Sequence, residues 1–179
     1  GCRGGWTIGS EALGGVRDVL FEDLYSSSES GIRISAELHR GGFVENVTFR
    51  RLRFDWQVLE KKSFLLHLEQ NYDPSADFAP CLYPNGTKCP IPSFTPKQTM
   101  PVFDGIRFEN ITVVHAPSNL SIGKVNCSIA PCHNIAFDGV HLLDAQHPQA
   151  IKCTGVHGTE TDVDQHAWGA TGCVTRYTR

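Results

Sequence analysis

The sequence predicts an all-β solenoid, a parallel β-helix. A nine-residue phrase occurs four times along the chain, as Val16–Leu24, Val44–Leu52, Phe103–Ile111 and Cys132–Val140. Aligned copies form three apolar columns, and the middle column is phenylalanine in every copy. The copies follow one another by 28 residues (47 minus 19), 59 (106 minus 47) and 29 (135 minus 106), so one coil takes about 28 residues and the middle interval is about one coil too long.

Apolar and polar residues alternate inside each copy, which is the period of a half-buried strand. A single coil cannot bury its own apolar face, so the coils must stack on one another. Helical repeats fit less well, because no long stretch carries an apolar stripe at a spacing of 3.6 residues and the copies are rich in valine, isoleucine and phenylalanine.

Each coil is expected to contain at least one further strand. Short apolar segments fall at matching offsets, at Trp6–Gly9, Gly31–Ile34, Ser63–Leu68, Asn119–Ile122 and Ala150–Cys153. The residues directly before the first apolar column tolerate turn conformations, and we interpret them as stacked turn formers rather than ligands; they are Asp18, Asn46, Gly105 and Asn134.

The pattern predicts coils over residues 1–153 and an irregular tail or cap over 154–179, where the chain is polar and has no strand pattern. Within the coils, residues 73–100 contain six prolines, which cannot donate to a strand ladder. This stretch is therefore predicted to leave the coils as a loop insertion. Such a loop can wall a binding groove, although an insertion without a role is an equal alternative.

The composition is that of an ordinary globular chain, with 179 residues, 40% hydrophobic residues and a net charge of -3. No apolar run is long enough to cross a membrane. The net charge and the scattered lysines and arginines, which form no basic stripe in the sequence, argue against a nucleic-acid partner. An anionic ligand is still open if a few cations line one groove.

Seven cysteines and five glycosylation sequons indicate an oxidising secretory route; the sequons lie at Asn46, Asn85, Asn110, Asn119 and Asn126. Cys81 with Cys89 and Cys127 with Cys132 are close enough to pair locally, and Cys153 with Cys173 could form a third pair, although spacing does not fix connectivity. Cys2 is then left over. We therefore expect the solenoid to be truncated at its N-terminal end.

Two phrases are more specific than the repeat. Cys2–Val16 contains Ile-Gly-Ser-Glu-Ala-Leu-Gly-Gly-Val, and Ser30–Ser35 is followed by Arg40–Val44 and later by Gln70-Asn-Tyr72. In this order they resemble the polygalacturonase-like enzymes of glycoside hydrolase family 28. The resemblance implies a right-handed parallel β-helix that is secreted to the cell wall and is monomeric at full length. It also implies hydrolysis of α-linked galacturonic acid chains in pectin by acid and base catalysis, without a cofactor or a metal.

The resemblance places substrate-binding residues at Arg33, Ser35 and Tyr72, with Ser35 where the family has lysine and Arg3 where it has histidine. The strand pattern supports Arg33 independently, because burying Ile32 and Ile34 turns Arg33 to the other face. A guanidinium there can hold a uronate carboxylate bidentately. The alternative is a solvated Arg33 that is paired with a nearby acid such as Glu11 or Glu37.

No complete catalytic set is present in this sequence. Glycoside hydrolysis needs two carboxylic groups, and the family's Asn-Thr-Asp and Asp-Asp phrases occur nowhere in the 179 residues. We therefore expect this segment alone to be inactive. One alternative is a non-catalytic β-helix that binds acidic polysaccharide or acts as a surface adhesin. Another is a pectate lyase, which would need clustered acids for calcium that the strands do not display.

Overall fold

The computed structural model describes residues 5–9, 14–27, 30–37, 41–56, 64–72, 101–115, 121–128, 130–143, 150–164 and 172–175. Arg3, Glu11, the insertion 73–100 and the proposed Cys81–Cys89 pair lie outside these residues. No helix in the described part is long and apolar enough to cross a membrane.

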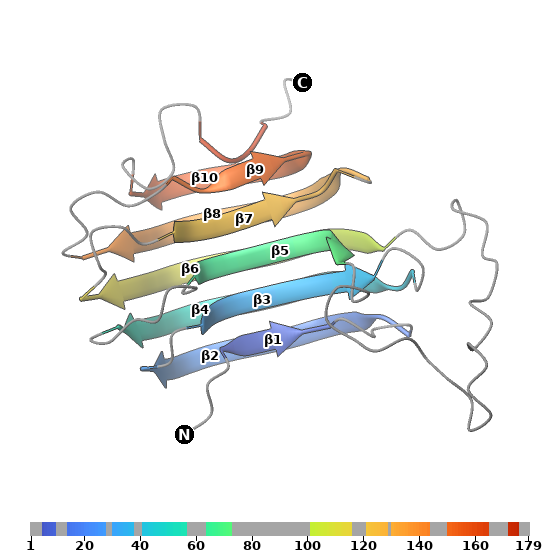
Figure 1. Ribbon diagram of the computed structural model, residues 1–179. Helices are drawn as coiled ribbons and strands as arrows, with labels where there is room; N and C mark the ends of the chain where they lie inside the picture. The colour runs from blue at the N-terminus through green and yellow to red at the C-terminus, as the bar shows by residue number, and fades with distance from the viewer. Residues whose placement is uncertain are drawn as a thin grey trace, which may run out of the picture.

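Ten strands form two parallel sheets, which confirms the predicted all-β parallel β-helix. Sheet A has the order β1-β3-β5-β7-β9, and its strands are Trp6–Ile8, Ser30–Glu37, Phe64–Tyr72, Ser121–Asn126 and Lys152–Thr154. Sheet B has the order β10-β8-β6-β4-β2, and in chain order its strands are Val16–Ser26, Phe43–Asp55, Val102–Val114, Cys132–Leu142 and Val156–Val163. Figure 1 shows the coils stacked in chain order, with the two sheets as facing layers.

The predicted core columns are confirmed by the pairing between strands. Phe21, Phe49, Phe108 and Phe137 are register partners in successive strands of sheet B. Their rings stack almost parallel, with centroid distances of 4.6, 5.5 and 5.1 Å between successive pairs. Each ring therefore covers the next, which is how a coil that cannot bury its own apolar face is stabilised by its neighbours.

The predicted turn formers are also confirmed. Asp18, Asn46, Gly105 and Asn134 all have φ between 50° and 66°, the left-handed region. The side-chain amides of Asn46 and Asn134 donate to Asp18 and Asp104, at 2.5 and 2.7 Å. Because asparagine, aspartate and glycine enter this region at the lowest cost, they bend β2, β4, β6 and β8 at the same place.

A second left-handed column, which the sequence did not indicate, follows the first by five residues on β2, β4, β6 and β8 and also includes a residue of β10. Its members are Asp23, Arg51, Asn110, Gly139 and Asp162, with φ between 49° and 68°. Asn110 therefore has a backbone role in the described structure, as Asn46 does. Arg51 is the residue in this column for which the sequence gives no turn signal, since arginine is not a usual turn former.

The predicted irregular tail is wrong over Val156–Val163, which forms β10 and pairs with β8. The repeat was hidden because β10 places Gly158 beside Ile135 and Glu160 beside Phe137, so two of the three apolar columns lose their apolar residue. An oxygen of Glu160, Oε1, accepts hydrogen bonds from the backbone amides of Cys173 and Val174, the latter at 2.9 Å. The segment 172–175 thus closes this end of the phenylalanine stack.

The two ends of the stack differ in how well their core residues are covered. Val47, Phe49 and Leu52 in β4 are at most 1% exposed, whereas their register partners in β2 are half-buried. At the other end, two disulfides join the coils to later parts of the chain: Cys127, directly after β7, bonds to Cys132, and Cys153, within β9, bonds to Cys173. Both pairs match the pairings that the sequence made available.

Candidate functional site on the outer face of sheet A

Strand β3 sets the direction of the candidate ligand-binding side chains. Ile32 and Ile34 are 1% and 0% exposed and belong to the core, while Arg33 between them is half-buried on the opposite face. This placement of Arg33 confirms the strand argument made from the sequence. Successive side chains of a strand point to opposite faces, so burial of both isoleucines in the core places Arg33 on the other face.

The other predicted site residues are placed less favourably or lie outside the description. Ser35 follows Arg33 on the same face, but its side chain is only 3% exposed, so it offers almost no surface to a ligand. Tyr72 is the last residue of β5 and pairs with Glu37, which is itself buried. The side chain of Tyr72 and the whole of Arg3 are outside the described structure.

The strands that follow β3 carry a charged cluster that the sequence analysis did not single out. Glu69 on β5 has a side chain that is 13% exposed, and its two carboxylate oxygens contact different basic side chains. Oε2 lies 2.9 Å from Nε2 of His67 on the same strand, and Oε1 accepts a hydrogen bond of 2.7 Å from the ammonium of Lys124 on β7. The carboxylate therefore joins β5 to β7.

The cluster changes the ionisation of Glu69. Burial is the largest influence and would raise the pKa of the carboxyl group, but hydrogen bonds from His67 and Lys124 and their charges outweigh it. Together they lower the pKa of Glu69 from 4.5 to about 2. Glu69 is thus ionised across the working range of most enzymes, which makes it unsuitable as a proton donor.

Strand pairing aligns four basic side chains across sheet A. Arg33 is the register partner of His67, His67 of Lys124, and Lys124 of Lys152. We call these four residues the cation row. Their exposure rises toward β9, from a His67 side chain that is 21% exposed to a Lys124 side chain that is 41% exposed and an exposed Lys152.

The expectation that the basic residues form no stripe is therefore wrong for sheet A. The members lie 34 residues (67 minus 33), 57 (124 minus 67) and 28 (152 minus 124) apart, and only the last interval equals one coil. The middle interval contains the insertion 73–100, which conceals the alignment. Lys124 and Lys152, one coil apart, were the signal that could have been found.

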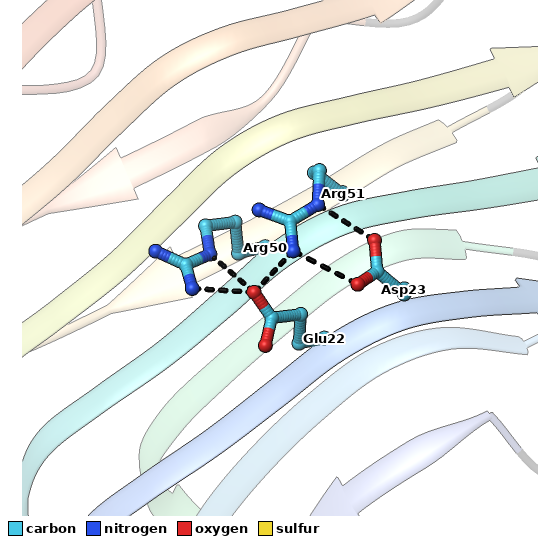
Figure 2. Close-up of polar contacts among 4 residues, drawn as sticks. All are labelled: Glu22, Asp23, Arg50 and Arg51. Atoms are coloured by element: carbon cyan, nitrogen blue, oxygen red, sulfur yellow. Dashed lines mark hydrogen bonds and ion pairs between the residues drawn. The ribbon is translucent and has the colours of Figure 1, made fainter.

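Sheet B arranges its charges in the opposite way. Several arginines of this sheet contact acidic side chains on the neighbouring strand: Arg17 contacts Glu45 at 2.6 Å, and Arg50 contacts Glu22 with Nε at 3.0 Å. Arg51 contacts Asp23 at 2.6 Å and also reaches Glu22 (Figure 2). Hydrogen bonds from Arg50 and Arg51 lower the pKa values of Glu22 and Asp23, respectively, despite some opposing desolvation.

Among the described residues, no group of three or more histidine, cysteine, aspartate or glutamate side chains is placed to hold a metal ion. What the outer face of sheet A offers chemically is fixed positive charge beside one ionised, already engaged carboxylate. Such a face suits the binding of an anion with several negative groups.

Comparison with known proteins identifies relatives of this chain. A probable polygalacturonase from Vitis vinifera is 37% identical over 168 residues, which cover 92% of this chain and 28% of that protein. The chain is a relative of the polygalacturonases. An exopolygalacturonase from Rhizopus delemar is 25% identical over 168 residues, which cover 89% of this chain and 39% of that protein. No family model matches the chain, and no solved structure matches it either.

The relationship to polygalacturonases confirms the resemblance to glycoside hydrolase family 28 that the motifs around Gly9 and Arg33 predicted. It spans about nine-tenths of the chain. The chain spans well under half the length of either polygalacturonase relative.

Proposed function

We propose that this chain is the substrate-binding part of a pectin-degrading glycoside hydrolase, which cleaves α-linked galacturonic acid chains by acid and base catalysis. The names of both relatives and the parallel β-helix support this class of enzyme. The observation that carries the proposal is the position of Arg33. The core holds it on the outer face of sheet A, where a planar guanidinium can take a uronate carboxylate in a bidentate manner.

In this proposal the chain binds substrate, and other residues of the enzyme perform the cleavage. The two aspartate phrases of the family are absent from the 179 residues. Glu69 is a carboxylate on the same face, but a pKa of about 2 and its two engaged oxygens make it unsuitable for protonating a leaving oxygen. The chain alone should therefore bind polygalacturonate and release no reducing ends.

An extracellular location belongs to the same proposal. The described structure contains two disulfides, and disulfides persist in oxidising compartments such as the secretory route and the cell wall. Asn126, in one of the sequons, accepts a hydrogen bond of 3.2 Å from the backbone amide of Ser128 through its side-chain oxygen. The side-chain nitrogen, the atom to which a glycan is attached, takes no part in this hydrogen bond.

Binding of polygalacturonate to the chain tests the role of Arg33. Arg33→Ala should weaken binding by at least about tenfold, because a hydrogen-bonded charge pair is lost. Arg107→Ala is the matched control, since Arg107 is an exposed arginine on β6 of sheet B. Unchanged binding by the Arg33 variant, or no binding by the unmodified chain, would contradict the proposal.

The alternative function is that of a non-catalytic β-helix that binds acidic polysaccharide. The absence of the two aspartate phrases from the 179 residues and the low pKa of Glu69 favour it. A reducing-end assay on polygalacturonate with the full-length gene product distinguishes the two. Hydrolysis that continues in the presence of a calcium chelator supports the hydrolase. Binding without hydrolysis supports the non-catalytic alternative, and activity that a chelator abolishes points to a lyase.

A further inference from the structure

We propose that the cation row is a continuous binding track for a polyuronate that lies along the stacking axis, with Lys152 as the contact farthest from Arg33. The inference rests on the proposed function, because it takes the ligand to be a chain of uronic acids. It extends that function by assigning a ligand contact to a coil three strands away from Arg33.

The first argument is the contrast in charge between the two sheets. Like charges directly opposite one another on paired strands destabilise a sheet. In sheet B, Arg17 faces Glu45 and Arg50 faces Glu22, and the like-charged register partners are acidic, Glu45 with Asp104 and Glu109 with Asp138. Sheet A instead places Lys124 directly beside Lys152 in the parallel register. A protein with a net charge of -3 thus concentrates positive charge on one face, where it stabilises a bound anion rather than the fold.

The second argument is that the row is held in place before any ligand arrives. Glu69 engages both His67 and Lys124, so these two side chains lose less freedom on binding. Lys152 stands on β9 next to Cys153, whose disulfide to Cys173 ties that strand to the closing segment 172–175. The Glu69 carboxylate contacts Lys124, whereas the described structure gives Lys152 no acidic partner.

The third argument is distance. Neighbouring strands lie about 4.8 Å apart, so the three intervals from β3 to β9 span about 14 Å. This length exceeds that of one sugar, and only an oligomer that runs along the axis can reach both Arg33 and Lys152. A polyuronate is such a ligand, because it carries one carboxylate on every sugar.

The test measures how affinity depends on ligand length. Calorimetric titration of the full chain uses α-1,4-linked galacturonates from the monosaccharide to the octasaccharide. Lys152→Ala should weaken binding of the octasaccharide by about two- to fivefold, the size expected for an exposed ion pair, and leave the monosaccharide and disaccharide unaffected. Lys152→Arg should retain the affinity for the octasaccharide. Lys124 is left intact, because removing it would also disturb Glu69.

Three controls separate the outcomes. Arg107→Ala on sheet B should bind every length as the unmodified chain does, and equal unfolding midpoints should show that all variants are folded. Equal binding of the octasaccharide by the unmodified chain and Lys152→Ala, or an equal loss at every length, would overturn the track. A single-stranded oligonucleotide that binds more tightly than the octasaccharide, in a manner that depends on Lys152, would also overturn it.

A second polyuronate separates failure of the track from failure of the proposed function. Oligomannuronates of the same lengths carry the same charge on a different sugar. If galacturonates do not bind but oligomannuronates do, with the predicted effect of Lys152→Ala, the track stands and the galacturonan specificity falls. If neither series binds, both proposals are wrong. If galacturonates bind through Arg33 with no effect of Lys152, only the track is wrong.

Discussion

Lys124 donates a hydrogen bond of 2.7 Å to Glu69 on the neighbouring strand of sheet A. The bond connects two coils that are 55 residues apart in the sequence (124 minus 69). It holds one oxygen of a carboxylate whose other oxygen contacts His67, so one half-buried acid holds two basic side chains in place. Predictions about stability and about the site follow from such contacts between coils.

Glu69→Gln should lower the free energy of unfolding by about 1–2 kcal/mol near neutral pH. The full pKa shift from 4.5 to about 2 would correspond to more, but the Lys124 side chain is 41% exposed and water screens the pair. The pKa is depressed in the folded state, so the contribution is complete above about 4.5. As the pH falls from 4.5 toward 2, the unfolded chain takes up the proton first and the contribution disappears. Denaturant unfolding of both proteins across this range measures it, and a difference that does not depend on pH would contradict the assignment.

Gln70→Ala should destabilise the protein by about 1–3 kcal/mol. Gln70 is 0% exposed; its side-chain nitrogen donates to the carbonyl of Pro101 at 3.2 Å, and its oxygen accepts from the amide of Ala130 at 3.3 Å. Removing the side chain leaves the buried carbonyl of Pro101 and the half-buried amide of Ala130 without these bonds. Gln70→Glu is the informative control, because its carboxyl can form both bonds only when protonated. Its stability relative to Gln70→Ala should improve as the pH is lowered, and the absence of this trend would argue against the bridging role.

Phe49→Ala should cost about 3–5 kcal/mol, because the ring is 0% exposed and lies between Phe21 and Phe108. Phe21→Ala should cost clearly less, since Phe21 is half-buried at the end of the described stack and has a stacked neighbour on one side in this structure. Unfolding curves of the two variants give the comparison directly. Equal costs would mean that position in the stack does not determine how much a ring contributes.

Removing the two disulfides one at a time should give different losses. Replacing Cys153 and Cys173 by serine removes a disulfide between residues 20 apart and should lower the free energy of unfolding by about 3 kcal/mol. The same change at Cys127 and Cys132, which are 5 residues apart, should lower it by about 2 kcal/mol. The longer closure restricts the unfolded chain more. Chemical unfolding of the two double variants tests this order, with Glu160→Gln as a further variant that weakens the closing segment and leaves both disulfides in place. The reverse order would show that local strain or residual structure outweighs chain entropy.

Repetition made part of this structure predictable. The alternation inside the nine-residue copies depends only on residues close together in the sequence, and the period near 28 shows which copies lie on one another. From these follow the phenylalanine stack, the first left-handed column and the outward position of Arg33 between Ile32 and Ile34. The disulfide Cys127–Cys132 was available from closeness in the sequence, and Cys153–Cys173 as a possible further pair.

Other features could not be inferred because they depend on which residues oppose each other after connections of unequal length. The pattern failed at β10, where Glu160 stands in the phenylalanine column and is satisfied by backbone amides of a later segment. It failed likewise at the cation row, whose members are separated by 34, 57 and 28 residues (67 minus 33, 124 minus 67, 152 minus 124). The sequence by itself determined the coils, their core and the face on which Arg33 lies, since local alternation and a regular period are enough for these. Only the tertiary structure decided which charges become neighbours, because a shift of one residue in strand register turns every side chain to the other face.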